Sequence, residues 1–246
     1  MLVDNMIGNW SAFKGSAGYR LVDSVRGNNC TLANMDAGTD WVGAAVRGQS
    51  GYAIDFDGAN DRAELTRAMS FSTTSFSFSI WANQNAAGIG MPVGDRTSTT
   101  NYIWFRSGNY LRFSTPASLV EFTGVTNFTN WNHAVLTGSV SANPAVSTIE
   151  LFWNGIRQTP LAMINGTFTL NTIGDGYASQ AFPFPGRIAE VASWSAPITP
   201  AEALELFRLG PGWFQPNKAR RRGTAAAAAF KSYWARRQTQ LIGGGL

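Results

Sequence analysis

The chain has 246 residues, of which 44% are hydrophobic and 14% charged, with a formal net charge of +4 and one cysteine. One cysteine excludes an intrachain disulfide and favours maturation in a reducing compartment, so the fold must rest on its core. No stretch approaches the roughly 20 apolar residues of a membrane-spanning helix, and the N-terminus lacks the basic start and apolar run of a signal peptide. We therefore expect a soluble protein made in the cytoplasm.

The charges are unevenly distributed along the chain. Residues 213–246 carry seven of the nineteen Lys and Arg and no Asp or Glu. The preceding 212 residues carry 12 basic and 15 acidic side chains, so a body of net charge −3 is followed by a tail of +7. Such a segment gains little by folding onto itself, which indicates an arm that docks on something else. We predict a body over residues 1–212 and a docking tail over 213–246.

In chain order, the body is predicted to consist of strands with a period of two. In residues 75–81, Phe76, Phe78 and Ile80 alternate with serines, which predicts a half-buried strand. Similar segments, bounded by Gly, Asn, Ser or Pro, recur at 102–106, 110–113, 133–136 and 149–153. Strands follow one another without intervening helices, as in an antiparallel all-β protein.

Two dipeptides predict tight hairpin turns, because their residues tolerate positive φ. They are Asp57-Gly58 and Asn154-Gly155, each of which follows an apolar strand segment. Both favour antiparallel pairing of the flanking strands.

One helix is predicted near the end of the body, over residues 200–209. Thr199 and Glu202 have the spacing of a capping box around a Pro at the first helical position. Gly210-Pro211 ends the helix.

Five motifs occur in an order that resembles the laminin-G and concanavalin-A-like jelly-roll superfamily. They are the segments 51–61, 76–81, 131–135, 151–155 and 186–191. The resemblance covers about residues 1–212 and implies an all-β fold, an antiparallel two-sheet jelly-roll sandwich with one short helix. Residues 211–216, followed by a short and partly helical basic extension, are also similar to the ends of laminin-G-like virion proteins of tailed phages.

The superfamily contains glycanases, whose retaining members place a nucleophile and an acid on one strand as Glu-x-Asp-x-Glu. This sequence has no such triplet: Asp55 and Asp57 directly precede a Gly turn, and Glu190 has no acidic partner two residues away. The sole histidine, His133, lies within a predicted strand and is expected to be packed rather than to act as a base. We predict no catalytic residues and no enzymatic activity.

No cofactor is expected, and Ca²⁺ is the only metal considered. Asp57, Asn60 and Asp61 gather oxygen ligands around a turn, which suits a hard cation, and laminin-G-like domains often bind calcium at a sheet rim. The alternative is that a tight turn selects Asp, Gly and Asn for its own geometry.

A candidate glycan-binding surface lies on the hairpin formed by residues 102–113. Tyr102, Trp104 and Arg106 share one strand parity, and Tyr110 and Arg112 share one on the next strand. Sugars require aromatic faces beside fixed polar groups. Two alternatives are burial of both sheet faces and use of the aromatic band as a subunit contact.

The tail combines basic clusters with an aromatic stripe, because residues 225–240 favour a helix on which aromatic residues recur at spacings of three and four. A partner-docking arm is favoured over a nucleic-acid-binding segment or an unstructured solubilising tail. The predicted docking residues are Trp213, Phe214, Lys218, Arg220, Arg221, Arg222, Phe230, Tyr233, Trp234, Arg236, Arg237 and Leu241.

The leading hypothesis is a non-catalytic structural protein of a phage virion, either a capsid decoration or a tail-associated protein. The body would be displayed, and the tail would anchor it to other virion proteins or to copies of itself. Host surface glycans are further candidate partners, and no membrane is expected. A free-standing lectin-like module is the alternative, and a glycan hydrolase that uses Asp55, Asp57 or Glu190 is the third reading.

Overall fold

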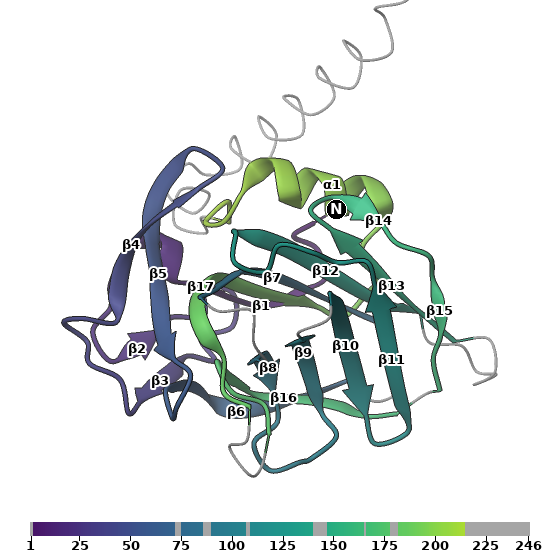
Figure 1. Cartoon of the computed structure of the whole chain (residues 1–246), viewed down its shortest axis with the longest axis horizontal. Helices are drawn as coiled ribbons and strands as arrows, with labels where there is room; N and C mark the ends of the chain where they lie inside the picture. Colours follow the sequence, from purple (N-terminus) through teal and green to yellow (C-terminus); the bar gives the residue numbers. More distant parts are fainter. Residues whose placement is uncertain are drawn as a thin grey trace, which may run out of the picture. The chain divides into compact units, whose positions relative to one another are not determined.

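The computed structural model describes residues 2–71, 75–85, 90–106, 109–139, 147–164, 166–177 and 182–214. Two antiparallel sheets form a sandwich, with one α-helix over one of them (Figure 1). This confirms the predicted all-β jelly-roll fold. Residues Met1–Trp213 form one compact unit.

The first sheet contains nine strands and gathers the two ends of the body. Their order is β14-β13-β12-β7-β17-β5-β4, with β1 also pairing with β17 and β15 with β13. The strands are β1 (Met6–Ser11), β4 (Trp41–Val46), β5 (Gln49–Asp57), β7 (Phe76–Gln84), β12 (Asn132–Ser139), β13 (Thr148–Trp153), β14 (Ile156–Arg157), β15 (Leu161–Ala162) and β17 (Pro185–Trp194).

The second sheet contains eight strands in the order β11-β10-β9-β8-β16-β6-β3-β2. A short 3-10 turn, Ala12–Lys14, and the helix α1 (Pro200–Leu209) complete the described elements. The strands are β2 (Arg20–Leu21), β3 (Cys30–Ala33), β6 (Arg62–Phe71), β8 (Gly90–Gly94), β9 (Tyr102–Arg106), β10 (Tyr110–Thr115), β11 (Ser118–Thr123) and β16 (Phe168–Ile173).

A cluster of phenylalanines joins the inner faces of the two sheets. Phe78 of the first sheet lies 4.9 Å from Phe71 and 5.1 Å from Phe168 of the second, measured between ring centroids. Phe168 also lies 5.1 Å from Phe113. Each such ring pair adds about 0.5–1.5 kcal/mol beyond the burial of its area, so these contacts hold the sheets together.

Strand β7 is buried on both faces, so the prediction of a half-buried strand is wrong. Its Phe and Ile side chains face the core as expected, but Ser77 and Trp81 on the other face are buried as well. The Ser77 hydroxyl accepts a hydrogen bond from the N–H of Ile198 at 2.9 Å. The Trp81 ring stacks on Phe207 of α1, with centroids 5.9 Å apart. The helix and the loop before it cover this face.

The two predicted hairpin turns have different outcomes. Asn154 and Gly155 have φ values of 54° and 79° and join β13 to β14 in a two-residue hairpin, as predicted. Gly58 also has a positive φ, 76°. However, β5 and β6 on either side of it belong to different sheets, so Asp57-Gly58 turns the chain from one sheet to the other and is not a hairpin.

Helix α1 has the predicted bounds and cap. The side chain of Thr199 accepts the N–H of Glu202, and the Glu202 carboxylate accepts the N–H of Thr199 at 3.0 Å. The chain leaves the helix at Gly210, whose φ is 72°. Within the described ranges, no helix is long and apolar enough to cross a membrane.

Glu190 of β17 binds the backbone near the C-terminal end of the body. The residue is 1% exposed, and its Oε2 accepts the backbone N–H of Gly212 at 2.7 Å. Glu190 lies opposite Ser11 of β1. Burial raises the pKa of Glu190, and this effect outweighs the opposing effects of the Gly212 N–H, Ser11, Lys14 and other neighbours.

Replacing Glu190 by Ala should destabilise the body by about 1–3 kcal/mol, because the partly buried N–H of Gly212 loses its acceptor. Urea-induced unfolding of the full chain would measure the change. Glu150→Ala is the matched control, since Glu150 pairs with an Arg157 side chain that is 52% exposed, and an exposed pair contributes about 1 kcal/mol or less. An equal loss of stability in the two variants would show that the contact between Glu190 and Gly212 does not stabilise the body.

Glu190→Gln should keep the acceptor and change the pH dependence. Because its folded pKa lies above the usual 4.5, the folded state holds the Glu190 proton more tightly than the unfolded chain. Stability from this group is present below pH 4.5 and is lost as the pH rises through the folded pKa. The Gln variant should therefore lose less stability than the wild type over that rise.

Candidate functional site

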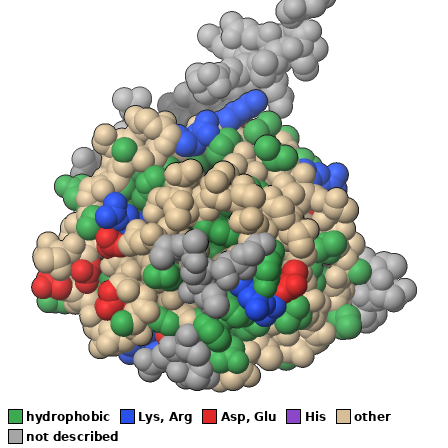
Figure 2. All heavy atoms as spheres, in the orientation of Figure 1, with side chains coloured by type: hydrophobic (Ala, Val, Ile, Leu, Met, Phe, Trp, Pro, Cys, Tyr) green, Lys and Arg blue, Asp and Glu red, His purple; other side chains and the backbone are tan. Residues whose placement is uncertain are grey.

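The five predicted glycan-binding residues gather on the outer face of the eight-stranded sheet. In the antiparallel register of β9 and β10, Arg106 lies opposite Tyr110 and Trp104 opposite Arg112. Tyr102 lies further along β9. Their neighbours in sequence face the core. We call Tyr102, Trp104, Arg106, Tyr110 and Arg112 the aromatic–arginine surface. Figure 2 shows basic and acidic side chains beside hydrophobic ones over this part of the sheet.

Two of the aromatic rings in this surface are covered. Tyr102 and Trp104 are 5% and 6% exposed. The Trp104 ring lies 4.9 Å from Phe182, and Tyr102 lies 6.0 Å from Tyr177. Tyr110, Tyr177 and Phe182 keep part of their surface exposed. A ligand would therefore meet the partly exposed rings and the arginines first.

The two arginines lie against the aromatic rings. The Cζ of Arg112 lies 4.8 Å from the Trp104 ring centroid, and that of Arg106 lies 4.9 Å from the same ring. Such contacts contribute about 0.5–1 kcal/mol at exposed sites. Arg112 Nε donates to Glu121 of β11 at 2.7 Å. The rings and Glu121 thus set the positions of both guanidinium groups.

A second ion-pair group extends along the same sheet. Asp175, 1% exposed, lies with its Oδ2 2.9 Å from Arg96 Nε. Arg96 also contacts Glu64, whose Oε1 lies 2.5 Å from Arg62 Nε. Burial raises the pKa of Asp175, and its backbone contacts and the two arginines lower it by a smaller amount. These charges occur in balanced pairs.

Several residues that contact or flank the aromatic–arginine surface were not predicted from the sequence. Glu121 could have been found, because the hairpin register places it opposite Arg112. Tyr177, Phe182 and Asp175 come from a distant segment of the chain, and nothing in their local sequence indicates that they return to this sheet.

The predicted calcium ligands stabilise their own turn. Asp57 Oδ1 accepts the N–H of Ala59 at 2.7 Å, and Asp61 Oδ2 accepts the N–H of Asp57 at 3.0 Å. Burial, followed by nearby carboxylates, raises the pKa of Asp61 despite the opposing Asp57 N–H. Among the described residues, no three or more His, Cys, Asp or Glu are placed to hold a metal ion. Calcium binding by Asp57, Asn60 and Asp61 stays a prediction.

The carboxylates considered for hydrolysis have structural partners. Asp55 accepts Arg187 Nε at 3.1 Å, and Asp57 holds its own turn. Both lie on β5, opposite the start of β17. Glu190 lies further along β17 with its carboxylate buried against Gly212.

His133 is packed inside the molecule, as its position in a strand suggested. It is fully buried, and its Nε2 lies 2.8 Å from the Ser79 hydroxyl. Its ring stacks on Trp81, with centroids 4.5 Å apart. Burial lowers the pKa of His133 to about 3, and the charge of Arg47 adds to this effect. The imidazole is therefore neutral at physiological pH.

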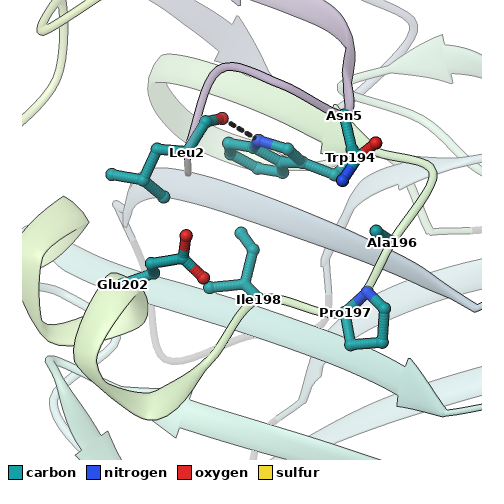
Figure 3. Close-up of a pocket in the computed structure, with 7 residues that line it drawn as sticks. All are labelled: Leu2, Asn5, Trp194, Ala196, Pro197, Ile198 and Glu202. Carbon is teal, nitrogen blue, oxygen red and sulfur yellow. Dashed lines mark hydrogen bonds between the residues drawn. The ribbon is translucent and has the colours of Figure 1, made fainter.

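A small cavity lies where the N-terminal segment meets the end of β17 and the start of α1 (Figure 3). Leu2, Trp194, Ile198 and Glu202 are among its lining residues, and the Trp194 indole donates to the Leu2 carbonyl at 2.5 Å. Its volume of about 50 Å³ is well below the roughly 300 Å³ at which small-molecule sites begin. It is too small to hold a sugar.

The structure describes two of the predicted docking residues, Trp213 and Phe214, and both are partly buried. The other ten lie outside the described residues, namely Lys218, Arg220, Arg221, Arg222, Phe230, Tyr233, Trp234, Arg236, Arg237 and Leu241.

Comparison with known families and structures gives a consistent fold assignment. The family model for the concanavalin A-like lectin/glucanases superfamily, of laminin-G type, matches residues 57–203. Comparison with curated protein sequences finds no match. Domain 4 of an extracellular arabinanase from Geobacillus stearothermophilus, solved in complex with arabinotriose, is 16% identical with a TM-score of 0.55. That alignment covers 82% of this chain and 98% of the arabinanase domain.

Two toxin domains are similar over part of their length. The binding domain of Paraclostridial mosquitocidal protein 1 is 15% identical with a TM-score of 0.54, covering 84% of this chain and 52% of that one. The binding domain of botulinum neurotoxin serotype D/C is 13% identical with a TM-score of 0.54, covering 85% and 53%. This chain thus spans about half the length of these domains. At such identities the likeness shows the fold alone.

Replacing His133 by Phe should reduce the loss of unfolding free energy as the pH falls from 7 to 4. The unfolded chain takes up this proton near pH 6.5 and the folded state only near pH 3. Stability from the neutral imidazole is therefore lost as the pH falls through that window, by up to about 1.4 kcal/mol per pH unit. Phe keeps the stack on Trp81 and cannot titrate. Unfolding free energies from pH 7 to pH 4 would test this, and parallel curves for variant and wild type would contradict it.

Proposed function

The chain belongs to the concanavalin A-like lectin/glucanases superfamily, and we propose that it is a non-catalytic glycan-binding module whose ligand site is the aromatic–arginine surface. The observation that carries the proposal is a cluster of aromatic rings and arginines. The rings of Tyr177 and Phe182 pack against those of β9, and the guanidinium groups of β9 and β10 lie over the Trp104 ring. Sugars present both C–H faces and hydroxyls, which suit rings beside fixed polar groups. A similarly folded arabinanase domain in complex with arabinotriose is consistent with this role.

The positions of the carboxylates support a non-catalytic role. Retaining hydrolysis requires two carboxyl groups about 5–5.5 Å apart that flank the sugar. Asp55 is bound by Arg187, and Asp57 holds its own turn. Glu190 is 1% exposed and bonded to Gly212. These roles favour binding without hydrolysis.

Glycan binding by the full chain should be detectable on a glycan array and should depend on Tyr110. We expect Tyr110→Ala to weaken binding about tenfold, because loss of an aromatic contact of about 1.5 kcal/mol corresponds to that factor. Tyr52→Ala is the matched control, since Tyr52 is 45% exposed on the nine-stranded sheet. The bound glycan should show no new reducing ends after incubation.

Two results would contradict the proposed function. One is the absence of binding to any arrayed glycan. The other is hydrolysis that Asp55→Asn, Asp57→Asn or Glu190→Gln abolishes, since that would establish a glycanase.

We further propose that the body is displayed on a phage particle and that the tail anchors it to other virion proteins or to further copies of the chain. The specific observation is the charge of the tail: residues 213–246 contain seven basic and no acidic side chains. Gly212, just before that segment, is held by Glu190. Display in many copies would let weak glycan contacts sum to a useful avidity.

Attachment should depend more on the predicted aromatic stripe than on the basic cluster. We expect Trp234→Ala to release the chain more readily than Arg221→Ala, because truncating a buried aromatic costs about 3–5 kcal/mol and losing an exposed ion pair about 1 kcal/mol or less. Mass spectrometry of particles after a high-salt wash would quantify the retained chain. The reverse order would indicate phosphate binding, and absence of the wild-type chain from particles would exclude the virion role.

A further inference from the structure

Arg106 is fixed in place while its hydrogen-bond donors stay available. Its Cζ lies 4.9 Å from the ring centroid of Trp104 and 5.1 Å from that of Tyr110. Its ion-pair contact within the described ranges is with Glu121, whose Oε1 lies 4.0 Å from Nη1 and thus beyond hydrogen-bond distance. The described residues offer Arg106 no hydrogen-bond acceptor. A guanidinium held by rings on two sides needs little further ordering to bind a ligand.

The neighbouring Arg112 is used differently. Its Nε donates to Glu121 at 2.7 Å, and its Nη2 contacts the same carboxylate oxygen. Glu121 therefore neutralises Arg112 and leaves the charge of Arg106 largely uncompensated. The two arginines and one glutamate carry a net charge of about +1 at this end of the aromatic–arginine surface.

A second donor without an acceptor lies directly beside Arg106. The Nε1 of Trp104 is buried, and none of the described residues accepts its hydrogen bond. Leaving a buried N–H without an acceptor costs free energy, which a ligand oxygen placed there would recover. Both unused donors therefore favour an oxygen-rich anionic group.

We propose that the aromatic–arginine surface recognises an acidic glycan, with Arg106 binding a carboxylate of the sugar and the Trp104 indole N–H donating to an oxygen of the same residue. This inference rests on the proposed glycan-binding function and specifies its substrate class. The planar guanidinium matches a carboxylate in two parallel hydrogen bonds. Partly exposed Tyr110, Tyr177 and Phe182 provide ring surface for the C–H faces of the sugar.

The test compares acidic oligosaccharides with their own neutral forms. Hexasaccharides of polygalacturonate, alginate and polysialic acid, each also prepared with its carboxyl groups reduced to alcohols, are titrated into the full-length protein in 150 mM salt. Dextran sulfate oligomers form a further arm. We expect at least one carboxylated oligosaccharide to bind tenfold or more tightly than its reduced form.

The basic tail attracts any polyanion, so substitutions in the body must separate the two contributions. We expect Arg106→Gln to weaken binding of the carboxylated oligosaccharide at least tenfold and to leave its reduced form within twofold. Arg106→Lys should give an intermediate loss, because it keeps the charge without the planar fork. Arg157→Gln is the matched control, since Arg157 lies on β14 of the other sheet and pairs with Glu150. All these variants share the same tail.

Trp104→Phe provides a second variant that keeps an aromatic ring and removes the N–H. It should weaken carboxylate binding about fivefold with an unchanged melting temperature. Unchanged carboxylate binding by Trp104→Phe would show that the indole N–H is not part of the proposed site.

The outcomes separate this proposal from the proposed function. Equal binding of acidic and reduced oligosaccharides, both weakened by Tyr110→Ala, would leave a glycan-binding module and overturn the acidic ligand. Arg106-dependent binding of dextran sulfate alone would overturn the carboxylate assignment. Tight binding of the acidic forms that Arg106→Gln does not change would place the contact outside the aromatic–arginine surface and overturn the site. Binding of no oligosaccharide would overturn both proposals.

Discussion

The pairing of β17 with three other strands is the constraint on which the rest of the body depends. One edge of β17 bonds to β7, and the other edge bonds first to β5 and then to β1. The register along β7 shifts between Ile188 and Glu190. A bulge of this kind bends a strand and re-aims its side chains. Strands from the beginning, middle and end of the body are thereby locked into one sheet.

Covering that sheet on both faces has an electrostatic cost. Helix α1 and the loop before it bury polar side chains that an open sheet would leave in water. The buried groups that titrate respond in opposite directions, because desolvation disfavours the charged form of each. The contribution of neutral His133 to the free energy of unfolding decreases as the pH falls. The contribution of protonated Glu190 decreases as the pH rises. The two buried groups therefore change the stability of the body in opposite directions as the pH changes.

Local sequence predicted those features that local physics determines. Period-two alternation located the strands, the pairing of Thr199 with Glu202 located the helix, and Asn154-Gly155 located a hairpin. The same logic misassigned Asp57-Gly58, because a dipeptide sets the sharpness of a turn and not the sheet that receives the next strand.

Burial of the candidate site could not be predicted in the same way. Strand parity placed five side chains on one face, which the structure bears out. The exposure of Tyr102 and Trp104 depends on Tyr177 and Phe182, which lie about 75 residues further along the chain. Only the three-dimensional fold brings that segment over the rings. A parity argument therefore identifies a face, and long-range contacts decide which of its members a ligand can reach.

The aromatic–arginine surface and Gly212, near the end of the body, lie on opposite faces of the sandwich. The aromatic–arginine surface lies on the outer face of the eight-stranded sheet, whereas Glu190 holds Gly212 against the outer face of the nine-stranded sheet. Because the inner faces of the two sheets pack on each other, these outer faces point away from one another. The pairing of β17 and the burial of Glu190 thus place Gly212 on the face of the body opposite to the aromatic–arginine surface.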